Sequence, residues 1–180
     1  MGTPSKVSTL SLLALSSLVL TACAGSSGGK SEAASHPLAR KPAPAMVVKL
    51  EKGGEFKPAD AKGKVLVVDF WATWCAPCKA SFPRVDAIYQ KHKAKGLEVI
   101  AVNEDEDLKK VPAFLAETKV SFTIAYDNEG KAAETYGVQT MPSSFVVDRR
   151  GVVRYAHSGY HPDDAAQIEA EIEELLGEAP

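Results

Sequence analysis

The sequence predicts an α/β domain in which helices flank a mixed central β-sheet. Residues 65–71 and 97–102 are nearly continuous apolar runs, a pattern typical of strands covered on both faces. A helical pattern over residues 76–94 connects them, so the two strands are expected to run parallel. Residues 143–148 and 152–156 are predicted to form an antiparallel hairpin, which makes the sheet mixed.

The other expected elements surround this unit. Gly53 and Gly54 favour a tight turn in an N-terminal β-hairpin extension, between residues 46–50 and the segment around Phe56. The remaining elements are a helix within 107–119, a short edge strand over 122–126, a short helix over 132–136 and an acidic amphipathic helix over 162–176.

The N-terminal segment differs from the rest of the chain. After Lys6, residues 7–20 are apolar and interrupted by serine, too short for a bilayer-spanning helix but typical of a secretory signal. Leu-Thr-Ala then precedes Cys23, which resembles the lipobox of bacterial lipoproteins, although an ordinary signal peptide with a chance cysteine would look similar. We therefore expect a lipoprotein signal peptide over 1–22 and lipidation of Cys23.

Residues 23–44 are rich in glycine, serine, alanine and proline and have little to bury, so they predict a flexible lipid-anchored tether. The folded domain is expected over residues 45–178. This organisation places the domain outside the cytoplasm, on the periplasmic face of a bacterial membrane.

Charge and cysteine content exclude several classes of protein. The net charge of -2 gives no basic excess of the kind that nucleic-acid binders carry. Of three cysteines, Cys23 is expected to carry lipid, which leaves Cys75 and Cys78. Two thiols three residues apart cannot form a disulfide framework or an all-cysteine zinc site, so no metal or other cofactor is expected.

Cys75 and Cys78 are expected where a buried strand gives way to a helix. Unpaired N–H groups at a helix start favour an anion, so Cys75 should be a stabilised thiolate. Cys75 would then attack a substrate disulfide, and Cys78, one turn further, would resolve the mixed disulfide. A CxxC motif alone also matches half of a zinc knuckle, but a tryptophan before it, a buried strand and the absence of a second CxxC favour redox chemistry.

The segment 69–79, Asp-Phe-Trp-Ala-Thr-Trp-Cys-Ala-Pro-Cys-Lys, resembles the thioredoxin active site. Over about residues 44–176, the chain resembles the membrane-tethered thioredoxin-like family that includes TlpA and ResA. Pro83 matches the proline that kinks the active-site helix in thioredoxins, and residues 137–142 match the family pattern that ends in a cis-proline. Gly159 matches a glycine that follows the family's last strand.

This resemblance implies a thioredoxin fold and a monomeric enzyme that reduces protein disulfides by dithiol exchange, drawing electrons from a membrane donor. Members of this family often take part in cytochrome c maturation or in thiol repair outside the cytoplasm. It also implies that Pro142 faces the dithiol through a cis bond, and that a substrate groove is lined by Trp74, Ala76, Pro77, Met141 and Gly159.

Asp69 is expected to be buried beneath the dithiol, because it shares one face of an apolar strand with Val67 and Trp71. A buried acid needs a partner or a raised pKa. Thioredoxins use an aspartate here to handle the proton of the resolving thiol, whereas many TlpA-like proteins have asparagine. The alternative is a structurally hydrogen-bonded aspartate.

Residues 104–107 are acidic and follow the second buried strand. The simpler interpretation is a solvated loop that enters a helix. The sharper one takes Glu106, which aligns with an acidic residue near the dithiol in ResA-like proteins, as a second proton relay. A two-residue shift in the alignment would transfer this role to Glu104.

Two other enzymatic or binding functions compete with dithiol exchange. A peroxiredoxin-type peroxidase usually has threonine three residues before its cysteine, but Thr73 lies only two before Cys75. A thioredoxin-fold metal chaperone usually has a longer cysteine spacing and a distant histidine ligand. His157 and His161 flank Gly159, but their spacing matches no known zinc module, so a metal site is not expected there.

Overall fold

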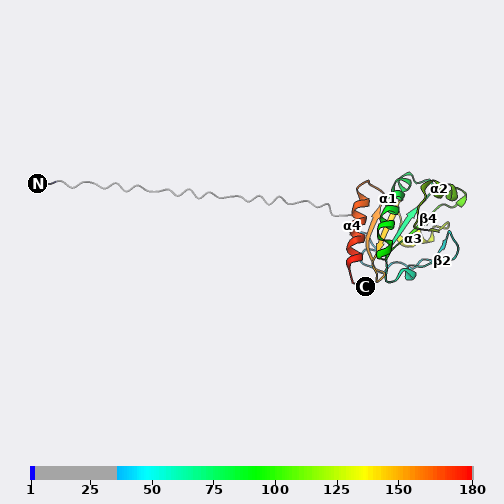
Figure 1. Ribbon diagram of the computed structural model, residues 1–180, viewed down its shortest axis with the longest axis horizontal. Coiled ribbons are helices and arrows are strands. Elements are labelled where there is room, and N and C mark those ends of the chain that lie inside the picture. The colour runs from blue at the N-terminus through cyan, green and yellow to red at the C-terminus, as the bar shows by residue number, and fades with distance from the viewer. Residues whose placement is uncertain (3–35, 180) are drawn as a thin grey trace.

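The computed structural model describes residues 1–2 and 36–179 (Figure 1). Cys23 and most of the predicted signal peptide and tether lie outside these residues. The strands are β1 (Val48–Leu50), β2 (Glu55–Phe56), β3 (Val65–Trp71), β4 (Leu97–Asn103), β5 (Thr123–Tyr126), β6 (Ser143–Val147) and β7 (Val153–Ser158). The helices are α1 (Ala76–His92), α2 (Val111–Thr118), α3 (Lys131–Tyr136) and α4 (Asp164–Gly177), with 3₁₀ segments η2 (Pro58–Ala61), η3 (Lys93–Lys95) and η4 (Leu108–Lys110).

The strands form one mixed sheet in the order β2-β1-β5-β4-β3-β6-β7. β3 runs parallel to β4 and β4 parallel to β5, while β6 and β7 form the predicted antiparallel hairpin beside β3. The predicted mixed sheet is therefore confirmed. β3 lies near the middle of the sheet, so the loop that follows it starts from a rigid, fully buried strand.

Each face of the sheet has its own apolar core because side chains alternate along β3. Val65, Val67 and Trp71 pack on the face covered by α1, α2 and α4, together with Phe82 of α1 and Ile172 of α4. The opposite face packs against α3 and η2, and its core includes Leu66, Val68, Phe70, Ala61 and Tyr136. Asp69 has the same parity as Val67, so it belongs to the α1 face.

The prediction that residues 122–126 form an edge strand is wrong. β5 is internal, because β1 pairs with it on the side away from β4, with Lys49 opposite Tyr126 and Leu50 opposite Ala125. Ile124 and Ala125 are accordingly buried. The predicted N-terminal hairpin is confirmed, and it supplies the missing neighbour of β5.

Residues 36–44, predicted as part of a flexible tether, are hydrogen-bonded to the domain. The Arg40 N–H donates to the Val153 carbonyl at 2.7 Å, the Val153 N–H donates to the Lys41 carbonyl at 2.9 Å, and Pro42 pairs with Val152. The open edge of the sheet at β7 offers free backbone groups, and this segment satisfies some of them. The folded unit therefore begins before residue 45.

Candidate active site

Cys75 and Cys78 form a disulfide at the start of α1, with sulfur atoms 2.01 Å apart. β3 ends at Trp71, a short loop follows, and Cys75 occupies the N-cap position of the helix. The Cys78 N–H donates to the Cys75 sulfur at 3.1 Å. Because the free N–H groups and dipole of a 17-residue helix favour negative charge at this sulfur, reduction of the bond would leave Cys75 as the more stable thiolate.

The two cysteines differ in access. Cys78 is fully buried, whereas Cys75 keeps 4% of its surface exposed and borders an open groove. Trp74 beside it is 69% exposed, which is unusual for a large aromatic side chain. This arrangement lets a partner reach Cys75 and keeps Cys78 for an internal attack.

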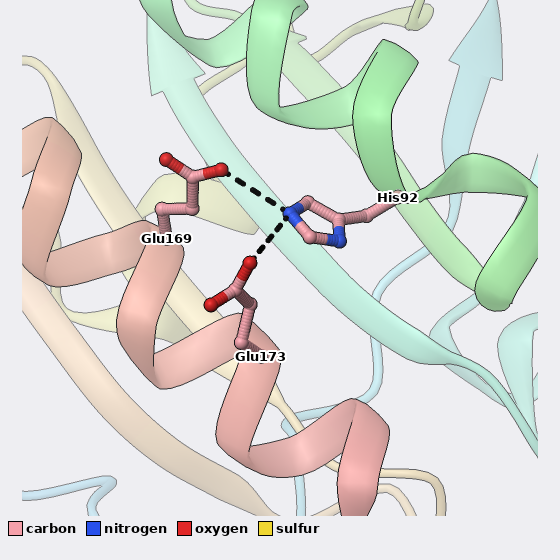
Figure 2. A group of neighbouring side chains, drawn as sticks. All are labelled: His92, Glu169 and Glu173. Atoms are coloured by element: carbon pink, nitrogen blue, oxygen red, sulfur yellow. Dashed lines mark hydrogen bonds and ion pairs between the residues drawn. The ribbon is translucent and has the colours of Figure 1, made fainter.

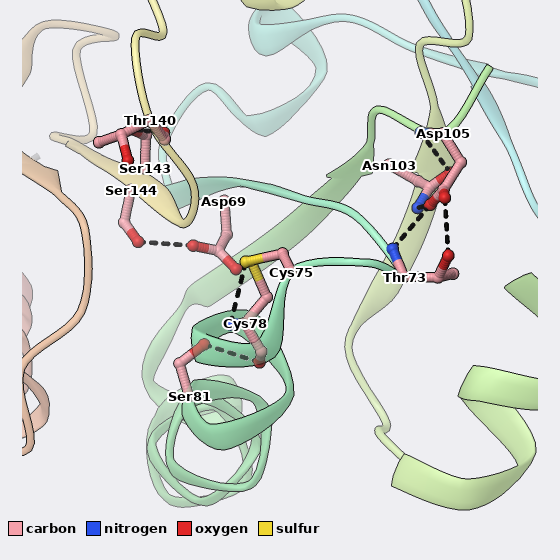
Figure 3. The surroundings of a disulfide bond; sticks show 10 residues. All are labelled: Asp69, Thr73, Cys75, Cys78, Ser81, Asn103, Asp105, Thr140, Ser143 and Ser144. Carbon is pink, nitrogen blue, oxygen red and sulfur yellow. Dashed lines mark hydrogen bonds between the residues drawn. A yellow bond between two sulfur atoms is a disulfide. The ribbon is translucent and has the colours of Figure 1, made fainter.

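Asp69 lies under the disulfide and points its carboxyl group toward it (Figure 3). The residue is 1% exposed, and the Ser144 hydroxyl on β6 donates to Oδ1 at 2.5 Å. Oδ2 is buried and has no hydrogen-bond partner among the described residues. Burial raises the pKa of Asp69 to about 7, while the bond from Ser144 opposes part of that rise. The predicted burial is thus confirmed, and Asp69 has both a hydrogen-bond partner and a raised pKa.

A second buried aspartate, Asp105, holds the loop that carries the dithiol (Figure 3). Its carboxylate accepts the Thr73 N–H at 2.8 Å and the Thr73 hydroxyl at 2.7 Å. It also accepts a hydrogen bond from the Asn103 side-chain amide at 2.7 Å, and the Asp105 N–H donates to the Asn103 side-chain oxygen. Sequence reasoning missed these three residues and Ser144. The sequence offered only a weak indication of them, namely that Asn103 and Asp105 come at the end of an apolar strand, at the edge of the sheet where the dithiol lies.

The acidic loop places Glu104 and Glu106 in different environments. Glu106 is exposed, whereas Glu104 is partly buried and its Oε1 has no hydrogen-bond partner among the described residues. Burial raises the pKa of Glu104 to about 8, and the nearby Asp127 carboxylate adds to the rise. The Glu104 N–H donates to the Trp71 carbonyl, which ties this residue to the start of the active-site loop.

The loop before β6 borders the dithiol from the other side. The Met141–Pro142 bond is cis, as predicted. The Gly159 N–H donates to the Pro142 carbonyl at 2.8 Å, which places the predicted glycine beside this proline. The groove along Cys75 has a mainly apolar lining: Trp74, Ala76, Pro77, Ala133, Val138, Gln139, Thr140 and Met141.

The two histidines near Gly159 do not join the dithiol. His157 bonds Glu171 of α4 at 2.6 Å, and His161 is an exposed loop residue whose Nδ1 lies 3.5 Å from Asp163. Neither histidine is grouped with the cysteines in a candidate metal site within the described part of the chain.

His92, Glu169 and Glu173 are the described residues whose spacing would suit a metal ion (Figure 2). The buried His92 ring points Nε2 at both carboxylates, at 3.2 and 3.4 Å. The Lys91 ammonium already pairs with the same two glutamates at 2.8 and 3.2 Å. The Lys91 ion pairs and the His92 contacts fasten the end of α1 to α4, so the group is explained as a helix–helix contact.

A model of the Redoxin family matches residues 38–176. The chain belongs to the Redoxin family. It is 39% identical over 113 residues to the thiol-disulfide oxidoreductase ResA of Bacillus thuringiensis, which is 63% of this chain and 65% of the relative. The chain therefore spans just under two thirds of the length of that curated Redoxin relative.

Solved structures of two similar proteins share the fold. A protein from Chlorobium tepidum that carries the name thiol:disulfide interchange protein DsbE is 40% identical, with a TM-score of 0.73 over 76% of this chain and 96% of its own. A second Chlorobium tepidum protein, a thiol:disulfide interchange protein of the thioredoxin family, is 26% identical with a TM-score of 0.66, over 76% of this chain and 96% of its own. These matches confirm the predicted thioredoxin fold and the likeness to ResA.

Proposed function

We propose that this Redoxin-family protein is a thiol–disulfide oxidoreductase that reduces disulfides in proteins. The observation that carries the proposal is the Cys75–Cys78 pair, with Cys75 capping a helix N-terminus at an open apolar groove and Cys78 buried behind it. The names of the relatives support the same chemistry.

The reduced protein would act in two exchange steps. The Cys75 thiolate attacks one sulfur of the substrate disulfide, forms a mixed disulfide and releases the other sulfur as a thiolate. Cys78 then loses its proton and attacks the Cys75 sulfur, which releases the second substrate thiolate and closes the Cys75–Cys78 bond. Two electrons have passed to the substrate, and a membrane electron donor would restore the dithiol.

Asp69 would serve as the base for the second step. Its carboxyl faces the dithiol with one oxygen free of hydrogen bonds, and its pKa of about 7 lets it accept a proton near neutral pH. Of the two candidates for a further proton relay, Glu104 suits the role better than the exposed Glu106, since burial holds its pKa at about 8.

The groove would bind an extended segment of the substrate next to its disulfide. Trp74, Ala76, Pro77 and Met141 would supply apolar contact. Gly159, expected in this groove, is not among its lining residues, and it contacts the site through its bond to the Pro142 carbonyl. The apolar lining favours a polypeptide over a small charged thiol, because little polar surface is available to bind charge.

The test uses the two single-cysteine variants as a matched pair. Cys75→Ser should abolish insulin reduction, while Cys78→Ser should still attack but accumulate mixed disulfides that dithiothreitol releases. Retention of reductase activity by Cys75→Ser would exclude the proposal. The equilibrium of the wild-type dithiol with glutathione then decides whether reduction or oxidation is the favoured direction.

We also propose that the protein works outside the cytoplasm, anchored by lipid on Cys23 after removal of residues 1–22. The support is the sequence pattern, since these residues lie outside the described part of the chain. Among the described residues, no helix has the length and apolar character needed to cross a bilayer.

Cys23→Ser should move the protein from the membrane fraction to the soluble fraction or stall its processing, while the domain keeps its activity. Unchanged fractionation and lipid labelling would contradict the anchor.

A further inference from the structure

The proposed reaction leaves a proton on Asp69 after every turnover, and this proton needs a way out. Asp69 is 1% exposed, and its Oδ2 faces the disulfide that has just closed. A disulfide carries no proton, so the dithiol itself cannot pass the proton on. The other oxygen, Oδ1, accepts a hydrogen bond from the Ser144 hydroxyl, and Ser144 lies on the side of Asp69 away from the cysteines (Figure 3).

Ser144 belongs to a row of polar side chains that crosses three strands. Asp69 on β3 pairs in register with Ser144 on β6, and Ser144 pairs with His157 on β7. Side chains directly opposite each other in antiparallel strands share one face, with Cβ atoms about 4.5–5.5 Å apart. One water between the Ser144 hydroxyl and Nδ1 of His157 would bridge such a gap while Nε2 keeps its bond to Glu171. The row therefore runs from the buried carboxyl to the last strand of the sheet.

Helix α4 completes the row at the surface. The His157 Nε2 lies 2.6 Å from a Glu171 carboxylate oxygen, and the other Glu171 oxygen accepts the Gln167 amide at 3.0 Å. The side chains of His157 and Glu171 are 11% and 10% exposed, so this end of the row reaches solvent. His157 uses Nε2 for Glu171, which leaves Nδ1 for exchange with Ser144.

We infer that Ser144, His157 and Glu171 form a proton route between Asp69 and solvent. The inference rests on the proposed function, since it serves the base of the second exchange step. Each transfer is balanced: the Asp69 carboxyl turns its protonated oxygen to Ser144, whose hydroxyl accepts this proton as it gives its own toward Nδ1 of His157, and His157 passes its Nε2 proton to Glu171, which releases it to water. Ser144 ends as it began, a flip of the His157 ring restores its starting tautomer, and no oxidant or reductant takes part.

The titratable groups that face this row come from three elements. They are Asp69 of β3, His157 of β7 and Glu171 of α4. The cysteines of α1 lie next to Asp69 but not next to the other residues of the row. Tyr155 lies on the same face of β7, but its hydroxyl donates to Glu174 at 2.9 Å, away from the row. In the sheet, therefore, His157 is the one proton-exchanging ring placed between Ser144 and Glu171 in the described part of the chain.

The experiment follows the Asp69 proton directly in the oxidised protein, where the cysteines hold no proton. Rapid mixing into D₂O at about pH 5 shifts the infrared C=O band of the protonated carboxyl, and the band is assigned by its loss in Asp69→Asn. His157→Gln keeps a donor for Glu171 but cannot relay a proton. We expect it to slow the exchange at least fivefold, and added imidazole should restore the rate. His161→Gln, in the exposed loop, is the matched control and should exchange like wild type.

Glu171→Gln provides a second variant if His157→Gln fails to fold, because it keeps the bond to the ring and removes the terminal carboxylate. It should show the same slowing and the same rescue by imidazole or acetate. Exchange at the wild-type rate in both variants, or slowing that no buffer relieves, would overturn the route. The measurement needs no catalysis, so failure of the route is separate from failure of the proposed function, which the cysteine variants test.

Discussion

Asp69 and Asp105 are both buried aspartates beside the active-site loop, but their surroundings differ (Figure 3). Asp105 accepts bonds from the Thr73 backbone, the Thr73 hydroxyl and the Asn103 amide. Asp69 accepts one bond, from Ser144, and one of its oxygens has no partner among the described residues. Both carboxyl oxygens of Asp105 are therefore hydrogen-bonded, whereas only one of the two oxygens of Asp69 is hydrogen-bonded among the described residues.

This difference separates a structural acid from a chemical one. Several donors satisfy the buried side chain of Asp105, which holds the loop in place. Asp69 lacks such donors, and burial raises its pKa to about 7. A group that gains and loses a proton near neutral pH suits proton transfer, whereas a carboxyl group with both oxygens hydrogen-bonded suits positioning.

The largest expected effect concerns the activity of Asp69→Asn. Removal of the base should slow the attack of Cys78 on the mixed disulfide on the order of 10²-fold near pH 7. The deficit should shrink as the pH rises, because hydroxide then deprotonates Cys78 unaided. Single-turnover kinetics from pH 6 to 9 measure both features, with Asp107→Asn at an exposed position as the control. A deficit that stays constant with pH would make Asp69 structural and leave Glu104 as the next candidate.

The same variant should also be more stable than wild type at high pH. The folded pKa of Asp69, about 7, lies above the unfolded value of about 3.9, so stability is fully present below pH 4 and falls as the pH rises through 7. At about 1.4 kcal/mol per pH unit, the loss reaches roughly 4 kcal/mol above pH 8. Urea unfolding of the oxidised proteins should therefore show similar stability at pH 4 and a more stable Asp69→Asn at pH 8. Parallel stability curves would contradict the raised pKa.

Asp105→Asn should produce a smaller change with the opposite sign. The amide keeps one acceptor oxygen and turns a donor toward the Thr73 or Asn103 donors, so at least one buried hydrogen bond is lost. We expect a loss of about 1–3 kcal/mol of unfolding free energy, with no special dependence on pH between 6 and 8. Glu106→Gln, one residue away and exposed, should stay within about 0.5 kcal/mol of wild type in the same urea series. Equal stability of the two variants would mean that the loop does not depend on Asp105.

The smallest expected effect separates Glu104 from Glu106. The folded pKa of Glu104, about 8, lies above its ordinary value of 4.5, so ionisation as the pH rises through 8 sets its charge against Asp127 and lowers stability. Glu104→Gln should flatten this decline between pH 5 and 8, whereas Glu106→Gln should leave it unchanged. Thermal unfolding at about pH 5, 6.5 and 8 compares the two. If Glu106→Gln flattened the curve instead, the roles of the two residues would be reversed.

Much of the candidate site could be predicted because it depends on short stretches of chain. The apolar run of β3 and the helical pattern after it place Cys75 at a helix start and Cys78 one turn later. Strand alternation places Asp69 on the face of Val67 and Trp71, and burial of an acid on that face raises its pKa. These consequences follow from geometry within about ten consecutive residues.

The sequence by itself determined the order of the elements, the position of the dithiol and the burial of Asp69. Only the tertiary structure decided which groups meet those residues: Ser144 beside Asp69, Asp105 on Thr73, Glu171 on His157, and β1 beside β5. Each of these contacts joins residues at least 14 positions apart. Local periodicity says which face a side chain occupies, but strand register and helix docking decide its neighbour, and both arise only when the whole sheet packs.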